Sequence, residues 1–181
     1  MTDKPRIVFA HIGLFVNDLA GMERFYTGFM GFTVTDRGHL SDLELVFLSA
    51  DPDEHHQIVL ASGRPAQLPF NVINQLSFRV DSLTDLKTLY GQLAEQPVSE
   101  IAPVTHGNAW SVYFRDPEGN RVELYTHTPW YVHQPLREPL DLALPEAEIR
   151  RRTEALCREL PGFTTRSVWR ERVEGLMREN G

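Results

Sequence analysis

The sequence predicts a protein of the α+β class, built from two βαβββ modules and a C-terminal extension. The first observation is an internal repeat, because residues 11–29 match residues 75–93 in their pattern of apolar positions. The second is that three further strand-like runs follow each copy. The third is a change after residue 127, where prolines become frequent. We therefore expect a domain over residues 1–127, with modules at about 6–63 and 71–127, and an extension over 128–181.

Each module is expected to begin with a strand and a helix. Strand-like runs cover residues 9–16 and 73–80, and each ends in Asn, Asp or Ser residues that can cap a following helix. Apolar residues then recur every three or four positions, which is the period of an amphipathic helix. These residues are Leu19, Met22, Phe25, Tyr26 and Phe29 in the first copy and Leu83, Leu86, Leu89, Tyr90 and Leu93 in the second.

Three more strands are expected to complete each module. They cover Phe32–Asp36, Leu43–Ala50 and His56–Ser62 in the first module, and Val98–Ile101, Ala109–Arg115 and Arg121–His127 in the second. Asp116, Pro117 and Gly119 stand where a type I turn favours them, so the last two strands should form a hairpin. We expect the modules to form one curved, cup-like mixed sheet with the helices outside.

The extension is expected to be a strap followed by two helices. Its prolines favour an extended chain, because proline fixes φ and moves the preceding residue out of the helical region. Pro145 suits the first position of a helix over Glu146–Leu160, and a second helix is expected over Ser167–Glu179. The apolar stripes of both helices indicate packing in a core or between subunits.

Composition limits the classes of function. A net charge of −7, without a basic stripe interleaved with aromatic residues, argues against nucleic acid as a partner. The apolar run near the start spans about ten residues and is broken by His11, which is too short to cross a membrane. The single cysteine, Cys157, suits a reducing compartment. We expect a cytoplasmic protein that binds a small molecule, and neither nucleic acid nor membrane.

Three side chains together suggest a metal site. Alternate residues of a strand share a face, so His11, Gln75 and Glu123 can converge inside a curved sheet. An imidazole, an amide and a carboxylate around a divalent metal would leave coordination positions open for other ligands. Taken singly, a strand histidine is more often a hydrogen-bonded core residue, so the interpretation depends on all three.

The segments that carry these side chains resemble the vicinal oxygen chelate superfamily, which includes glyoxalase I, type I extradiol dioxygenases and bleomycin-resistance proteins. The resemblance covers about residues 6–127 and is strongest in Tyr-Phe-Arg-Asp-Pro-Glu-Gly-Asn-Arg-Val-Glu-Leu-Tyr. It also includes Phe-Ala-His-Ile-Gly-Leu-Phe-Val and Asn-Gln-Leu-Ser-Phe-Arg-Val. These motifs are specific to the superfamily and not to one reaction.

Within the superfamily, the sequence is most similar to extradiol ring-cleaving dioxygenases, which hold Fe(II) with two histidines and a glutamate. The resemblance implies that His11 and Glu123 are metal ligands and that His56 transfers protons and handles oxygen. It also implies that His106 and Tyr113 contact the oxygens of a catechol-like aromatic substrate, with O2 as the second substrate. Since single-unit members of the superfamily commonly pair, we expect a homodimer.

Gln75 departs from the dioxygenase pattern, because the family has its second histidine there. An amide oxygen is a harder and weaker donor than imidazole, so the affinity for Fe(II) should fall. Fe(II) is still the metal that the resemblance implies, with Mn, Zn and Ni as alternatives.

Two other functions stay open. One is a glyoxalase-type metal-dependent lyase or isomerase, although that branch has a carboxylate on the fourth strand, where this sequence has Val59. The other is a non-catalytic, bleomycin-resistance-like binding protein whose aromatic residues stack on a planar ligand. We expect Trp110 and Trp130 to line the substrate site beside His106 and Tyr113. The surplus of proton-transfer groups favours an enzyme.

Overall fold

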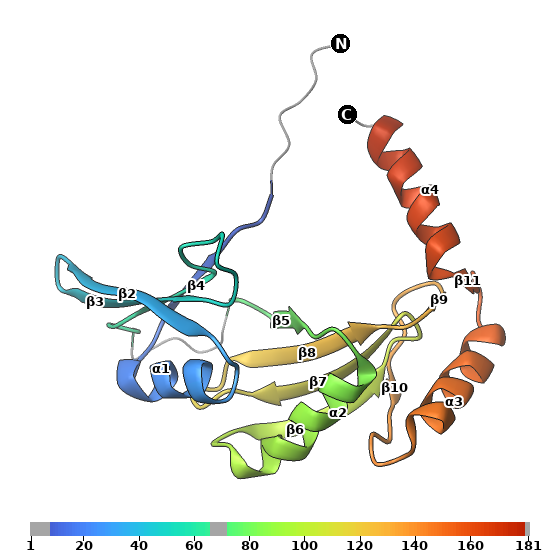
Figure 1. The fold of residues 1–181 in the computed structure, drawn as a ribbon, viewed down its shortest axis with the longest axis horizontal. Coiled ribbons are helices and arrows are strands. Elements are labelled where there is room, and N and C mark those ends of the chain that lie inside the picture. Colours follow the sequence, from blue (N-terminus) through green and yellow to red (C-terminus); the bar gives the residue numbers. More distant parts are fainter. Residues whose placement is uncertain (1–7, 66–71, 180–181) are drawn as a thin grey trace. The chain divides into compact units, whose positions relative to one another are not determined.

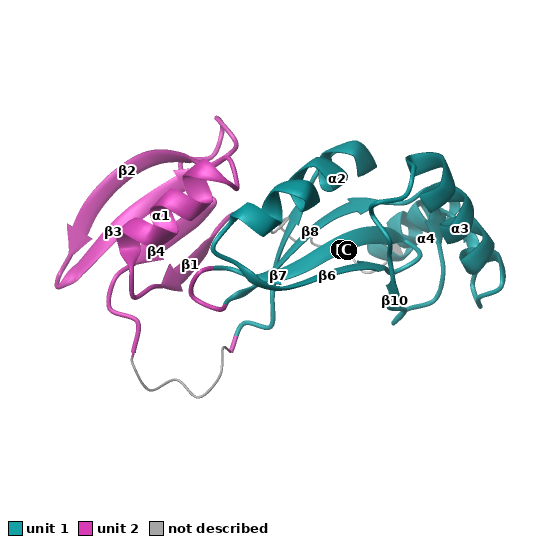
Figure 2. Cartoon of the chain, turned by 90° about the horizontal axis from the view of Figure 1, so that it is seen from below, with its two compact units in different colours: residues 1–4, 73–116, 120–181 teal, residues 5–72, 117–119 magenta. Residues whose placement is uncertain are grey.

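The computed structural model describes residues 8–65 and 72–179 and confirms the α+β class and the two βαβββ modules (Figure 1). The chain forms two compact units, shown in different colours in Figure 2. Of the described residues, unit 2 holds 8–65, 72 and 117–119, and unit 1 holds all others. Each unit has its own sheet, and a short two-stranded sheet also belongs to unit 1.

Unit 2 contains the first module, with a sheet in the order β1-β4-β3-β2. Only β1 and β4 are parallel among these neighbours. The helix begins after Asp18, whose carboxylate accepts a hydrogen bond from the backbone N–H of Gly21, as the capping pattern predicts. The elements are β1 (Ile12–Phe15), α1 (Leu19–Gly28), β2 (Thr33–Leu40), β3 (Leu43–Ser49) and β4 (Ile58–Ala61).

Unit 1 contains the second module, with a sheet in the order β10-β6-β7-β8-β5. Only β5 and β8 are parallel in it. Ser82 caps the helix, because its hydroxyl accepts a hydrogen bond from the backbone N–H of Asp85. The elements are β5 (Leu76–Arg79), α2 (Leu83–Gln92), the 3-10 turn η1 (Leu93–Glu95), β6 (Ser99–Thr105), β7 (Ala109–Arg115) and β8 (Arg121–His127).

The two faces of the unit 1 sheet differ in chemistry. Val112 and Phe114 of β7 and Leu124 of β8 lie on one face and are at most 3% exposed. The helix α2 contacts β7 and β8 and buries Leu83 and Leu86, because it covers this apolar face. The opposite face carries polar side chains of the same strands and is called here the polar face.

The extension has the predicted strap and two helices and belongs to unit 1. Its strap also adds an edge strand to the five-stranded sheet, with Glu138 opposite Thr105. The first helix buries Ile149, Thr153 and Cys157. The elements are β9 (Trp130–Tyr131), β10 (Glu138–Pro139), α3 (Glu146–Arg158), β11 (Thr164–Thr165) and α4 (Arg166–Glu179).

The β7–β8 hairpin shows why its turn motif has this sequence. The buried Asp116 carboxylate accepts hydrogen bonds from the backbone N–H of Asn120 at 2.9 Å and from its side-chain amide at 2.8 Å. Gly119 has a φ of +80°, which glycine adopts without steric cost. At the tip of the turn, Glu118 accepts hydrogen bonds from the backbone N–H groups of Asn17 and Asp18 at 2.7 Å within unit 2.

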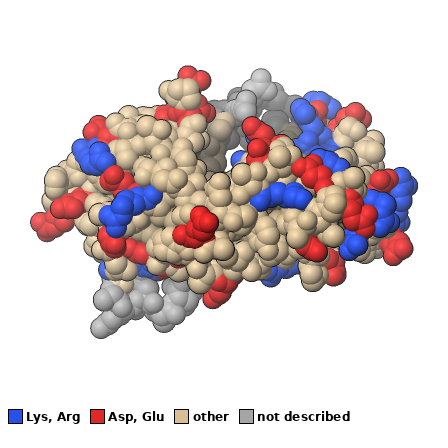
Figure 3. Space-filling view, turned by 60° about the horizontal axis from the view of Figure 1, so that its bottom comes forward, with Lys and Arg blue, Asp and Glu red and all other residues tan. Residues whose placement is uncertain are grey.

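Charged side chains are mixed on the face shown in Figure 3, where acidic and basic groups alternate without a broad basic area among the described residues. No helix in residues 8–65 or 72–179 has the length and hydropathy needed to span a membrane.

Candidate functional site

The predicted site residues belong to both units. His11 lies one residue before β1, and Gln75 lies one residue before β5, so the two are equivalent in the repeat. His56 lies two residues before β4, which corrects the expectation that the strand begins at His56. The imidazoles of His11 and His56 belong to unit 2, whereas unit 1 holds the remaining predicted residues, which are Gln75, His106, Tyr113, Glu123, Trp110 and Trp130.

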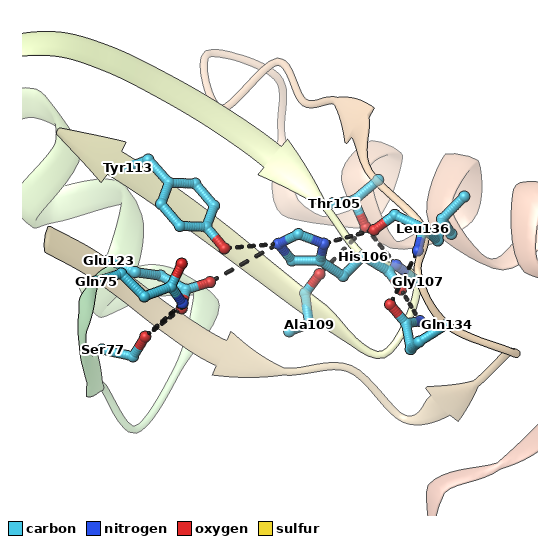
Figure 4. A network of polar contacts seen from close by, with 10 residues as sticks. All are labelled: Gln75, Ser77, Thr105, His106, Gly107, Ala109, Tyr113, Glu123, Gln134 and Leu136. Carbon is cyan, nitrogen blue, oxygen red and sulfur yellow. Dashed lines mark hydrogen bonds and ion pairs between the residues drawn. The ribbon is translucent and has the colours of Figure 1, made fainter. Parts of the chain in front are cut away.

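Glu123 is the centre of a polar cluster on the polar face of unit 1 (Figure 4). Its side chain is buried, and its Oε2 accepts hydrogen bonds from Ser77 Oγ at 2.6 Å and from Gln75 Nε2 at 3.0 Å. Ser77 stands opposite Glu123 in the sheet register, and Gln75 is two residues earlier on the same face. Because the amide nitrogen of Gln75 is used in these contacts, its carbonyl oxygen is the atom left to bind a ligand.

Tyr113 stands opposite Glu123 on β7 and brings a phenol to the cluster. Its hydroxyl lies 3.1 Å from Nε2 of His106, which occupies the turn between β6 and β7. Burial, followed by the adjacent Glu123 carboxylate, raises the pKa of Tyr113 to about 12. The phenol therefore stays protonated at neutral pH and can donate a hydrogen bond to an oxyanion.

A backbone carbonyl of the strap determines the tautomer of His106. His106 Nδ1 lies 2.5 Å from the carbonyl oxygen of Leu136, which can only accept, so Nδ1 must carry a proton. In the neutral imidazole, Nε2 is then the acceptor for the Tyr113 hydroxyl. The side-chain amide of Gln134 also donates to the backbone carbonyl of His106 at 2.8 Å. The strap therefore contacts this histidine both at its ring and at its backbone.

In unit 2, His11 and His56 form a ring pair with centroids 4.3 Å apart. Nδ1 of the preceding residue, His55, lies 2.9 Å from Nδ1 of His56. Partial burial, then the positive charges that His11 and His55 can carry, lower the pKa of His56. A neutral imidazole at this position can accept a proton.

Trp110 does not reach the polar cluster, which corrects the expectation that it lines the substrate site. It lies on the opposite face of β7 from Tyr113, because the two are three positions apart and side chains alternate between the faces of a strand. Only 1% of it is exposed, and its Nε1 donates to Thr153 of α3 at 2.8 Å. Trp130 packs edge-on against Trp110, with ring centroids 6.3 Å apart. Both tryptophans thus join the sheet to the extension.

Three contributors to the polar face were not predicted from the sequence. Ser77 lies two residues after Gln75, so strand alternation alone could have placed it on the same face. Arg121 lies two residues before Glu123 on β8, so the same alternation could have placed it on this face. Its guanidinium lies 4.4 Å from the Tyr113 ring centroid. No sequence pattern could have indicated the contact of the Leu136 carbonyl oxygen with His106, because every residue carries the same backbone oxygen.

The donors present fit a divalent cation. Glu123 is only 7% exposed and has no Lys or Arg partner among the residues that the structure describes. Its ion-pair contact is with Nε2 of His106 at 3.7 Å, which is unprotonated in the tautomer given above. A buried carboxylate without a positive partner is costly, so a metal ion held by Glu123 and the Gln75 carbonyl would balance its charge. In the described chain, His, Cys, Asp and Glu alone form no group of three suited to a metal, so Gln75 is essential to this set.

Comparisons with known proteins agree with this fold. Residues 8–124 match the family described as Glyoxalase/Bleomycin resistance protein/Dioxygenase superfamily. The chain is 32% identical over 186 residues to biphenyl-2,3-diol 1,2-dioxygenase 3 of Rhodococcus globerulus, covering 88% of this chain and 94% of that protein. It is 31% identical over 128 residues to biphenyl-2,3-diol 1,2-dioxygenase 2 of the same organism, covering 68% of this chain and 64% of that one.

A solved structure with the same fold is the glyoxylase/bleomycin resistance protein/dioxygenase domain from Frankia sp. EAN1pec. Its TM-score is 0.59 at 26% identity, and the match covers 68% of this chain and all of that domain. These matches confirm the resemblance found in the sequence motifs. The chain therefore belongs to the glyoxalase/bleomycin resistance protein/dioxygenase superfamily.

Proposed function

We propose that the protein is a metal-dependent, extradiol-type ring-cleaving dioxygenase that acts on a catechol-like aromatic and O2. The observation that carries this proposal is the buried Glu123 carboxylate, which has no Lys or Arg partner in the described chain and is surrounded by Gln75, Ser77, His106 and Tyr113. The relative that shares 32% identity over 88% of this chain, and bears the name of a biphenyl-2,3-diol 1,2-dioxygenase, supports the ring-cleaving branch.

In this proposal His11, Gln75 and Glu123 hold the metal, with Fe(II) as the first candidate and Mn, Zn and Ni as alternatives. When bound, a divalent cation lowers the pKa of a catechol hydroxyl that it coordinates. Tyr113 donates a hydrogen bond to the substrate oxygen, because its own raised pKa keeps the phenol protonated. His106 orients this phenol through Nε2.

His56 is proposed to move the protons of the reaction. Its lowered pKa keeps the imidazole neutral at pH 7, so it can take a proton from the substrate hydroxyl and return it later. His11 lies beside it in unit 2, which would place the proton acceptor next to a metal ligand.

Metal analysis of purified variants tests the metal site. His11→Ala and Glu123→Ala should lose bound metal, whereas His56→Phe should keep metal and substrate binding and slow turnover by about 10²-fold or more. His39→Ala, which removes an exposed imidazole, is the matched control and should keep both metal and turnover. Unchanged metal content in His11→Ala and Glu123→Ala would refute the ligand assignment.

Paired assays test the reaction itself. Oxygen uptake with catechols should be observed, and isomerisation of the methylglyoxal hemithioacetal should not. The reverse result would identify a glyoxalase-type enzyme, and binding of aromatics without either reaction would identify a binding protein. We also propose a cytoplasmic homodimer with a domain over residues 1–127 and an extension over 128–181, and light scattering tests the dimer.

A further inference from the structure

A pocket on the polar face of unit 1 is rich in arginine. It has a volume of about 450 Å³, which is large enough for a small organic ligand. Tyr113 lines it, so the pocket adjoins the polar cluster around Glu123. Its charged lining consists of Arg115, Arg121, Arg137 and a single carboxylate, Glu100. The pocket is therefore positive in a chain whose net charge is −7.

Two of these arginines have no carboxylate partner among the residues that the structure describes. Arg115 donates to Glu100 at 2.9 Å, which uses the only carboxylate of the pocket lining. Arg121 and Arg137 make neither an ion pair nor a side-chain hydrogen bond with the part of the chain that the structure describes. Two guanidinium groups in one pocket repel each other, so an anion between them would relieve this repulsion.

Tyr113 holds both guanidinium groups in place. The guanidinium carbons of Arg121 and Arg137 lie 4.4 Å and 5.2 Å from the centroid of its ring. Such contacts use the π-system of tyrosine and leave the N–H groups in the guanidinium plane available. Those N–H groups match the geometry of a carboxylate, which they can bind through two parallel hydrogen bonds.

A β-bulge shapes the wall of the pocket. The register between β6 and β7 shifts between Ser99 and Ala102, and Glu100 has a φ of +54°, which is rare for a residue other than glycine. Bulges bend a strand and change the direction of its side chains, and they are frequent beside active sites. Here Glu100, within the bulge, accepts its hydrogen bond from Arg115.

We propose that Arg121 and Arg137 bind an anionic substituent of the substrate, so that the enzyme prefers catechols carrying a carboxylate to neutral catechols. This proposal rests on the proposed function, because it takes the vicinal hydroxyls to lie at the cluster of Glu123, His106 and Tyr113. The hydroxyl of Tyr113 faces that cluster while its ring contacts both arginines, so one residue joins the two parts of the site.

Equilibrium binding to the full-length protein under anaerobic conditions tests this preference without turnover. The probes are 3,4-dihydroxybenzoate and 2,3-dihydroxybenzoate, each compared with its neutral benzamide by isothermal titration calorimetry. Within a pair the vicinal hydroxyls are the same, so the ratio of dissociation constants reports the carboxylate alone. At least one acid should bind about tenfold more tightly than its amide, and added salt should reduce the ratio.

Arg121→Gln and Arg137→Gln should each reduce this ratio several-fold, with smaller changes in the affinity for the benzamides. Arg172→Gln, on the exposed surface of α4, makes the same change in net charge and should leave the ratio unchanged. Arg137 is exposed on the strap, so its variant keeps the test valid if Arg121→Gln does not fold. Equal affinity for acid and amide in both pairs, no binding of any probe, or an equal loss in Arg172→Gln would overturn the proposal.

The binding experiment and the assay of the reaction can fail separately. Absence of oxygen uptake together with an arginine-dependent preference for acids would refute the dioxygenase and leave the anion site intact. Oxygen uptake with neutral catechols, without any preference for acids, would support the dioxygenase and refute the anion site.

Discussion

At the scale of single residues, Gln75 is where this chain departs from the ligand pattern of extradiol dioxygenases. Its amide nitrogen donates to both Ser77 and Glu123, so the amide orients the carboxylate while its carbonyl oxygen is left for a metal. In the proposed site, this double use would let an amide serve where imidazole is the stronger ligand for Fe(II).

Replacing this amide tests its role as a ligand. Gln75→His should raise the iron retained after purification, because imidazole binds Fe(II) more strongly than an amide oxygen does. Elemental analysis measures the iron content per chain. Gln92→His, at an exposed position of α2, introduces the same imidazole elsewhere and should not change the iron content. An unchanged content in Gln75→His would place the amide outside the coordination shell.

Cys157 is expected to be unreactive in the folded protein. Burial, followed by the negative charge of Glu154, raises the pKa of its thiol to about 11 from an ordinary value of 9.0. At pH 8 the thiolate fraction should thus be about 100-fold lower than in an unfolded chain. Alkylation by iodoacetamide should be at least that much slower without urea than in about 8 M urea. Similar rates in both conditions would show that the thiol is exposed.

At the scale of elements, the β6–β7 turn of the candidate site is tightly packed. Gly107 has a φ of +72°, and an added Cβ would lie 2.7 Å from Val132 Cγ2. Its carbonyl oxygen accepts a hydrogen bond from Thr128 Oγ1 at 2.5 Å. The strap is therefore packed directly on the turn that carries His106.

Gly107→Ala should lower the free energy of unfolding by about 2–4 kcal/mol, because the left-handed φ and the close contact with Val132 both oppose a side chain. Gly119→Ala separates the two effects, because Gly119 has a φ of +80° with no atom within 4 Å of an added Cβ. That variant should lose only about 1 kcal/mol. Urea unfolding measures both, and equal losses would show that the contact with Val132 adds nothing.

The sequence predicted most elements because their signals are local. Periodicity and capping residues located both helices of the modules, and the turn motif located the β7–β8 hairpin. The strand β6 was predicted to end at Ile101 but continues to Thr105. The edge strand β10 pairs only with the two residues after Pro103, so the ladder does not need the N–H group that proline lacks. Proline therefore interrupted the pattern without ending the strand.

The candidate site was predictable only in part. Strand alternation placed Gln75 and Glu123 on one face, and the structure confirms that these two side chains meet. The same rule would have excluded Trp110, which is three residues from Tyr113 and faces α3. The contacts of the strap with His106 span about thirty residues of sequence and involve backbone atoms, so no local pattern could reveal them.

At the scale of the whole molecule, the extension is an integral part of unit 1. The side chain of Thr84 in α2 donates to Glu146 of α3 at 2.5 Å, and Lys87 donates to the carbonyl oxygen of Leu144. Together with the bond from Trp110 to Thr153, these contacts join the extension to both a helix and a strand of the second module.

Core truncation in the extension should therefore destabilise the whole unit. Ile149→Ala removes a side chain that is 1% exposed and should lower the free energy of unfolding by about 2–4 kcal/mol. Val168→Ala is the control, because Val168 is 53% exposed and should change stability by less than about 0.5 kcal/mol. Equal effects in urea unfolding, followed by tryptophan fluorescence, would mean that α3 is not part of the folded core.

The carbonyl oxygen of Leu136 that fixes the proton on His106 has one more consequence. Every amino acid carries the same oxygen, so exchanging the side chain at position 136 leaves this contact in place. Inserting or deleting a residue between 128 and 136 would instead move the oxygen away and release the imidazole to take either tautomer. Among related chains, the tautomer of the equivalent histidine should thus depend more on the length of the segment between residues 128 and 136 than on which residues it contains.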